Sequence, residues 1–153
     1  MARYGISMEF EKGDLGRFNS ACNASVRNLF RGTKKATTEG CREILTDAVR
    51  RIPKYTGTAA DSAFMEVKRR SDTALSYWAY EGTVGFGGNG DPVNPITGEP
   101  ASAYVVAVHE NTHAVHPNGE AKFLENAVRE YMSSNFRRAV EVNAKDALRR
   151  WSD

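Results

Sequence analysis

Two long stretches with apolar residues at helical spacing frame this sequence and constrain its fold more than any other feature. In the first stretch, residues 15–52, apolar side chains return every three or four positions, as on one face of an α-helix. Pro53 ends the pattern, because a proline disfavours helix in the residue before it. The polar run at 31–35 interrupts it, so the stretch is either one bent helix or two helices. The second stretch, residues 120–151, contains no proline or glycine and predicts one long C-terminal helix.

Strand signals lie before and between these helices. Residues 4–10 alternate apolar with other side chains, which predicts a short strand buried on one face. Residues 64–67 and 74–86 also predict strands, the second because it is rich in aromatic and β-branched side chains. Residues 103–108 (AYVVAV) predict a further strand or a short buried segment. The order predicts an α+β fold, with a mainly antiparallel sheet of about four strands, a long helix after the first strand and a long C-terminal helix.

Composition is that of an ordinary globular chain. The 153 residues suit a single domain, 1–153, and the hydrophobic and charged fractions of 41% and 26% are typical of soluble proteins. No apolar run approaches the ~20 residues of a membrane helix. The N-terminus lacks the apolar core of a signal peptide, so we expect the chain to stay in the cytoplasm where it is made and to have no membrane partner.

The two cysteines indicate neither a disulfide nor a metal site. Cys22 and Cys41 lie on the same predicted helix, and their 19-residue separation corresponds to about 28 Å. A disulfide needs Cα atoms within about 7 Å, so the two thiols cannot pair within that helix. We interpret both as small buried hydrophobic residues. No CxxC pair is present, so the commonest zinc and redox signatures are missing, and we expect no cofactor.

A glycine- and proline-rich segment, about 87–100, predicts a long exposed loop between two strands. Loops of this length in a compact domain are often functional, although a disordered surface loop is the alternative. Its charged residues are all acidic. A loop of this kind can order against a neighbouring subunit, or line a channel whose acidic wall repels DNA phosphates. Its candidate contact residues are Asn89, Asp91, Asn94 and Glu99.

Charge is distributed unevenly along the chain, although the net charge is only +2. Between Glu81 and Glu120 there is no lysine or arginine, whereas basic clusters occur at 34–35, 50–51 and 68–70. An acidic region and basic regions on one molecule suit head-to-tail docking between copies. The alternative is that these charges are simply solvated surface.

The string HENTH matches the H-E-x-x-H pattern of zinc proteases. That chemistry requires His109 and His113 on one helix facing one zinc ion, with Glu110 as general base. The context opposes it, because the strand-like run 104–108 precedes the string and the turn residues 117–119 follow it. We assign no catalytic or metal-binding role here. We instead interpret the two histidines and the glutamate as candidate interface residues at the end of a strand.

Three segments, in order, resemble one family. Residues 52–62 (IPKYTGTAADS) are similar to its P-x-x-T-G-x-L-x-x-S segment, although alanine replaces leucine. Residues 104–110 (YVVAVHE) resemble its Y-A-x-x-V-E/H-x strand, and residues 116–127 (HPNGEAKFLENA) resemble its P-x-x-A-K-F-L-x-x-A-L entry to a C-terminal helix. The family is the tail-completion or head–tail joining proteins of lambda-like siphophages, often labelled minor capsid proteins and related to tail terminators. The loop at 87–100 is longer than the family's usual connection.

This resemblance implies a non-enzymatic structural protein of the virion, located at the neck or tail end after assembly in the host cytoplasm. It implies a homo-oligomeric ring, commonly a hexamer, that contacts connector or stopper and tail-tube proteins. Phage DNA would pass through the lumen of the ring. Two alternatives from other classes stay open: a zinc-dependent hydrolase built on His109, Glu110 and His113, and a generic protein-interaction module.

Overall fold

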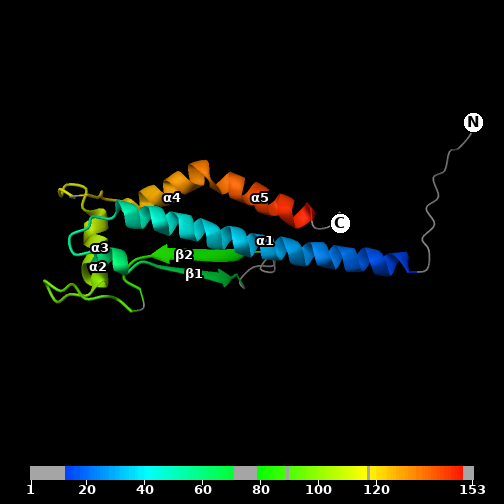
Figure 1. The fold of residues 1–153 in the computed structure, drawn as a ribbon, viewed down its shortest axis with the longest axis horizontal. Helices are drawn as coiled ribbons and strands as arrows, with labels where there is room; N and C mark the ends of the chain where they lie inside the picture. Colours follow the sequence, from blue (N-terminus) through cyan, green and yellow to red (C-terminus); the bar gives the residue numbers. More distant parts are fainter. Residues whose placement is uncertain (1–12, 71–78, 89, 117, 150–153) are drawn as a thin grey trace, which may run out of the picture.

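One very long helix organises the molecule. The structure is a computed structural model that describes residues 13–70, 79–88, 90–116 and 118–149. Its elements are α1 (Asp14–Arg51), α2 (Thr58–Asp61), β1 (Phe64–Arg69), β2 (Tyr80–Gly85), α3 (Ala101–Glu110), α4 (Phe123–Ser134) and α5 (Phe136–Arg149). The other described elements lie along the C-terminal part of α1 or at its C-terminal end, and its first turns project beyond them (Figure 1). None of the described helices is long and apolar enough to cross a lipid bilayer.

Helix α1 is continuous over 38 residues and passes through its three glycines, Gly16, Gly32 and Gly40, without a break. It ends at Arg51, in agreement with the stop predicted from Pro53. Gly40 is buried beneath Tyr131 of α4, and a Cβ atom there would lie 2.5 Å from the tyrosine hydroxyl. The glycine therefore allows α4 to approach α1 closely, which offsets its low helix propensity.

The β1–β2 hairpin lies flat against the middle of α1. The strands are antiparallel, in a register that runs from Phe64 opposite Gly85 to Arg69 opposite Tyr80. The Tyr80 ring meets the Phe30 ring of α1 edge-on, with centroids 5.0 Å apart. Further along β2, Gly82 lies directly over the Cys41 sulfur, so that any Cβ atom at this position would collide with it.

The main buried cluster lies at the end of the molecule where α1, α2, α3 and α4 meet. Its residues are Ile52, Ala59, Val105 and Phe123, and further buried apolar residues follow the contact between α1 and α4. The Phe123 ring makes edge-on contacts with two other rings. This cluster positions α4, which then leads α5 back along α1 (Figure 1).

The predicted sheet of about four strands is wrong, because the described residues form only a two-stranded sheet. Residues 103–108 belong to helix α3, whose buried positions Ala101 and Val105 are one helical turn apart. A short apolar run fits a buried helix as well as a strand, so periodicity alone could not decide. The predicted strand at 64–67 is confirmed as part of β1, whereas 4–10 and 74–78 lie outside the described residues.

Two connections also differ from expectation. The loop at 87–100 joins β2 to α3 rather than joining two strands. In place of the predicted single C-terminal helix there are two helices, α4 and α5, and the chain bends between them at Asn135. The hydroxyls of Ser133 and Ser134 donate hydrogen bonds to the Glu130 carbonyl at 2.9 and 2.7 Å. Serine side chains that compete for backbone acceptors in this way weaken a helix, which explains the bend.

We predict opposite outcomes for two glycine substitutions in α1. Gly40→Ala is expected to lower the free energy of unfolding by about 1–3 kcal/mol, because its Cβ overpacks against Tyr131. Gly16→Ala, which meets nothing within 4 Å, should be neutral or stabilising by up to about 1 kcal/mol. Urea unfolding followed by circular dichroism measures both, and Tyr131→Phe should partly rescue Gly40→Ala. Equal effects of the two substitutions would contradict the close α1–α4 contact.

Candidate functional site

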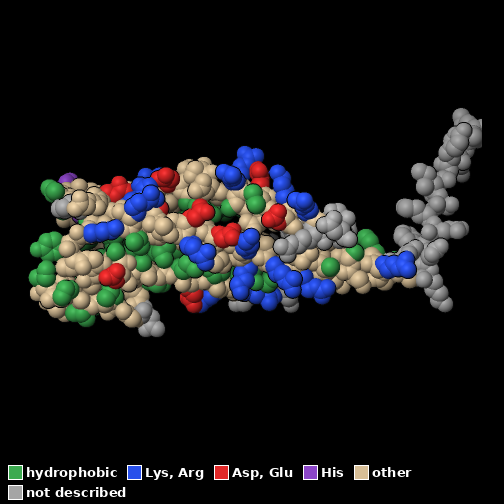
Figure 2. Space-filling model, in the orientation of Figure 1, with side chains coloured by type: hydrophobic (Ala, Val, Ile, Leu, Met, Phe, Trp, Pro, Cys, Tyr) green, Lys and Arg blue, Asp and Glu red, His purple; other side chains and the backbone are tan. Residues whose placement is uncertain are grey.

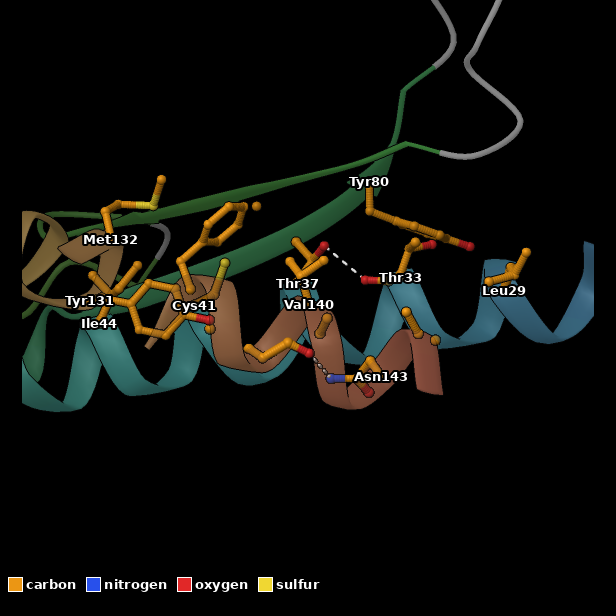
Figure 3. Close-up of a pocket in the computed structure, with 17 residues that line it drawn as sticks. Leu29, Thr33, Thr37, Cys41, Ile44, Tyr80, Tyr131, Met132, Val140 and Asn143 are labelled. Carbon is orange, nitrogen blue, oxygen red and sulfur yellow. Dashed lines mark hydrogen bonds between the residues drawn. The ribbon is translucent and has the colours of Figure 1, made fainter. Parts of the chain in front are cut away.

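An open apolar groove runs along α1 between the hairpin and the α4–α5 pair. It has a volume of about 390 Å³. One face of α1 forms its floor, β2 forms one wall, and the end of α4 with α5 forms the other (Figure 3). The floor is low because small residues follow one another at one-turn spacing: Gly32, Ala36 and Gly40. We refer to this feature as the groove.

The groove offers apolar surface rather than reactive groups. No charged side chain is among the described residues that line it. The Thr37 hydroxyl and the Asn143 amide are engaged with backbone carbonyls of their own helices, at 2.9 Å each. Burial raises the pKa of the Cys41 thiol, so this cysteine is protonated at neutral pH and is a poor nucleophile. The groove is therefore suited to an apolar binding partner rather than to acid–base or nucleophilic catalysis.

Large apolar side chains remain exposed around the groove and beyond it. On the α4–α5 wall, Met132, Phe136 and Val140 are all about half exposed. The first turns of α1, residues 14–28, which we call the helical arm, expose Leu15 and Phe18 by more than 60%. These exposed side chains make the groove and the helical arm candidate contact surfaces, because removing apolar surface from water is favourable.

The opposite end of the molecule carries a second apolar surface, which we call the end face. Hydrophobic side chains gather over this end in Figure 2. Its exposed residues come from α3 and the loops around it: Tyr55, Val93, Ile96, Val106 and Val115. The helical arm and the end face thus lie at opposite ends of an elongated molecule (Figures 1 and 2).

The predicted contact residues of the loop have mainly structural roles. Both carboxylate oxygens of Asp91 accept the Ser102 backbone N–H, at 3.1 and 3.0 Å, and so cap the start of α3. Asn94 is buried, and its side-chain oxygen accepts the Ile96 N–H at 2.9 Å, which holds a tight turn. Glu99 is exposed, whereas Asn89 lies outside the described residues. The loop instead exposes the apolar Val93 and Ile96, which the interpretation from polar and acidic residues missed.

The HENTH string does not form a zinc-binding helix. His109 and Glu110 are the last residues of α3, whereas His113 lies in the exposed turn beyond the helix. The His109 ring packs edge-on against Phe123, at 4.8 Å between centroids. Among the residues that the structure describes, no three histidine, cysteine or acidic side chains are grouped so that they can hold a metal ion.

His109 and Glu110 instead connect α3 to the start of α4. Glu110 forms an ion pair with Lys122 and a 2.8 Å hydrogen bond with the His109 ring. The hydrogen bond from Lys122, followed by that from His109, holds the pKa of Glu110 below its ordinary value. The His109 carbonyl accepts the Lys122 backbone N–H at 2.7 Å. Of these three residues, His109 is therefore largely packed within the fold, whereas Glu110 and His113 are exposed, and Glu110 also joins α3 to Lys122.

Comparison with known proteins returned no match to a family model, to a curated protein or to a solved structure.

We predict that the Glu110 connection depends on pH. Because the folded-state pKa lies below the ordinary value of 4.5, the pair stabilises the fold above that value, and this contribution is lost as pH falls through the folded-state pKa. Glu110→Gln should therefore lower the urea midpoint at pH 7 but change it little near pH 3. Glu99→Gln, on the exposed loop, serves as the control with little effect at either pH. A pH-independent effect of Glu110→Gln would contradict the ion pair.

Proposed function

We propose that this protein is a structural subunit of a tailed bacteriophage, of the tail-completion or head–tail joining type. In this role it acts without catalysis, in a ring of identical copies at the neck or tail end of the virion. The observation that carries the proposal is the apolar surface that a single copy leaves exposed at separate places. The groove, the helical arm and the end face each expose several large apolar side chains among the described residues, and clustered exposure of this kind is typical of protein–protein contact surfaces.

The distribution of these surfaces suits a ring. A ring needs heterologous contacts, in which one surface of each copy meets a different surface of the next copy. The helical arm projects at one end of the molecule, and the groove lies further along α1 (Figure 1). A contact between the arm of one copy and the groove side of the next uses different surfaces on each copy, so it can repeat until the ring closes.

The three segments that resemble the tail-completion family support the proposal in a second way. They supply all four buried residues of the core cluster: Ile52 and Ala59 from the first segment, Val105 from the second and Phe123 from the third. Segments far apart in sequence thus pack against one another. The resemblance therefore lies on residues that pack into one structural unit, although its second segment, a strand in the family, belongs to helix α3 here.

The end face is the surface that we assign to the adjoining connector, stopper or tail-tube protein. It is apolar and lies at the far end of the molecule from the helical arm. It includes the exposed part of the loop at 87–100, where Ile96 is 67% exposed beside the acidic Glu99. In a ring, this loop would meet either that neighbouring protein or the DNA in the lumen.

Native mass tests the proposal. We expect light scattering of the purified full chain to give the mass of several associated copies, either alone or after addition of a tail-tube or connector protein. Negative-stain images should then show closed rings. Phe18→Asp in the helical arm should weaken association by roughly tenfold or more, about 1.4 kcal/mol, because it places a charge in an apolar contact. Asn19→Asp, at the neighbouring exposed position, is the matched control and should still assemble.

Two other results would contradict the proposed function. A chain that stays monomeric at all concentrations and with every tail protein would contradict the phage role and favour a generic interaction module. Bound zinc that is lost on replacing His113 would contradict it in favour of a hydrolase.

A further inference from the structure

The wall of the groove that β2 forms is the edge of a sheet. Among the described residues, β2 pairs only with β1. Tyr80 and Gly82 of β2 line the groove, and no residue of β1 does, so the unpaired edge of β2 is the edge nearest the groove (Figure 3). A free edge carries unpaired backbone N–H and C=O groups, which form a template for another strand.

The dimensions of the groove fit one short strand. Its floor extends along α1 from Leu29 to Ile44, which corresponds to about 22 Å at 1.5 Å per residue. A strand of seven residues spans about 23 Å at 3.3 Å per residue. A strand placed beside β2 would direct alternate side chains towards α1, where the small floor residues leave space for large side chains.

Residues 4–10 of this chain have the matching pattern. Their seven residues alternate, with large apolar side chains on one face and small or polar ones on the other. The apolar face consists of Tyr4, Ile6, Met8 and Phe10. In the groove this face would cover the apolar floor, and the other face would meet solvent.

The length of the intervening chain excludes self-insertion of this strand. Leu29, at the near end of the groove, lies 16 residues after Gly13, which is about 24 Å along α1. Phe10 is only three residues before Gly13 and reaches at most about 11 Å from it. Even with the chain fully extended back along the helix, Phe10 therefore falls short of its own groove by more than about 10 Å. A second copy is not restricted in this way.

We propose that residues 4–10 of one copy add a third strand to the β1–β2 sheet of the next copy and fill its groove. The proposal rests on the self-association in the proposed function and identifies the contact that produces it. Each copy donates one strand and accepts one, so the contact repeats from copy to copy and is compatible with a closed ring. Backbone hydrogen bonds to β2 would provide affinity, and the apolar pattern would provide register.

Cross-linking between two different variants tests this contact. In a Cys22→Ser, Cys41→Ala background, full-length chains with Ile6→Cys or Met8→Cys are mixed with chains that carry Val140→Cys, under mild oxidation. Val140 lines the groove, whereas Val142, two residues later on α5, does not; their exposed fractions are 47% and 49%, so Val142→Cys is a matched control. We expect the covalent heterodimer with Val140→Cys to exceed that with Val142→Cys by roughly tenfold or more, since a disulfide requires Cα atoms within about 7 Å.

Native mass supplies the second measurement. Ile6→Asp should reduce the assembled mass to that of the monomer, whereas Ser7→Asp, on the opposite face of the strand, should leave it unchanged. Neither substitution lies in a described element, so the circular dichroism of both variants should match that of the parent protein.

The outcomes separate this inference from the proposed function. Rings that form without preferential cross-linking at Val140, or that survive Ile6→Asp, would overturn the strand exchange and leave the ring-forming role intact. Preferential cross-linking without a closed ring would support the strand exchange and count against the ring. An occupant from within the same chain would give no heterodimer, and that result also overturns the inference.

Discussion

The C-terminal end of α1 is the constraint on which the rest of the structure depends. The Arg51 guanidinium binds three carboxylates: Asp47 of its own helix, Glu120 at 3.0 Å before α4, and Glu130 within α4. These partners, Glu120 first, raise the pKa of Arg51 above its already high ordinary value, so the cation persists wherever the fold does. These charge-assisted hydrogen bonds join the end of α1 to the segment before α4 and to α4 itself, at the same end of the molecule where the buried cluster around Phe123 positions α4.

Beyond this junction, the buried apolar residues are unevenly distributed along α1. The core cluster lies at one end of α1, yet the helix extends for about 57 Å at 1.5 Å per residue over its 38 residues. The hairpin, α4 and α5 are all shorter than α1 and lie along only part of it. Among the described residues, the groove and the helical arm are the parts of α1 that remain exposed, and the proposed assembly would cover them.

Several of the predicted contact residues also organise the backbone. Asp91 and Asn94 were predicted as contacts in a long acidic loop, and Glu110 at the end of a predicted strand. In the structure they cap α3, hold a turn and join α3 to Lys122, and their role as contacts stays a prediction. The surfaces left for partners are apolar, on α5, the helical arm and the end face. Sequence periodicity had already placed several of these residues on apolar helix faces, but no pattern could show that the other described elements pack elsewhere and leave them exposed.

The sequence by itself determined the local elements whose signals are long or unambiguous. A sustained helical period predicted α1, Pro53 ended it, and a short β-rich run predicted β1. Only the tertiary structure decided that the run at 103–108 is helical, that the C-terminal helix bends at Asn135, and that the described sheet has two strands. The physical reason is that period and propensity act over a few neighbouring residues, whereas the choice between buried helix and buried strand depends on packing partners that are distant in sequence.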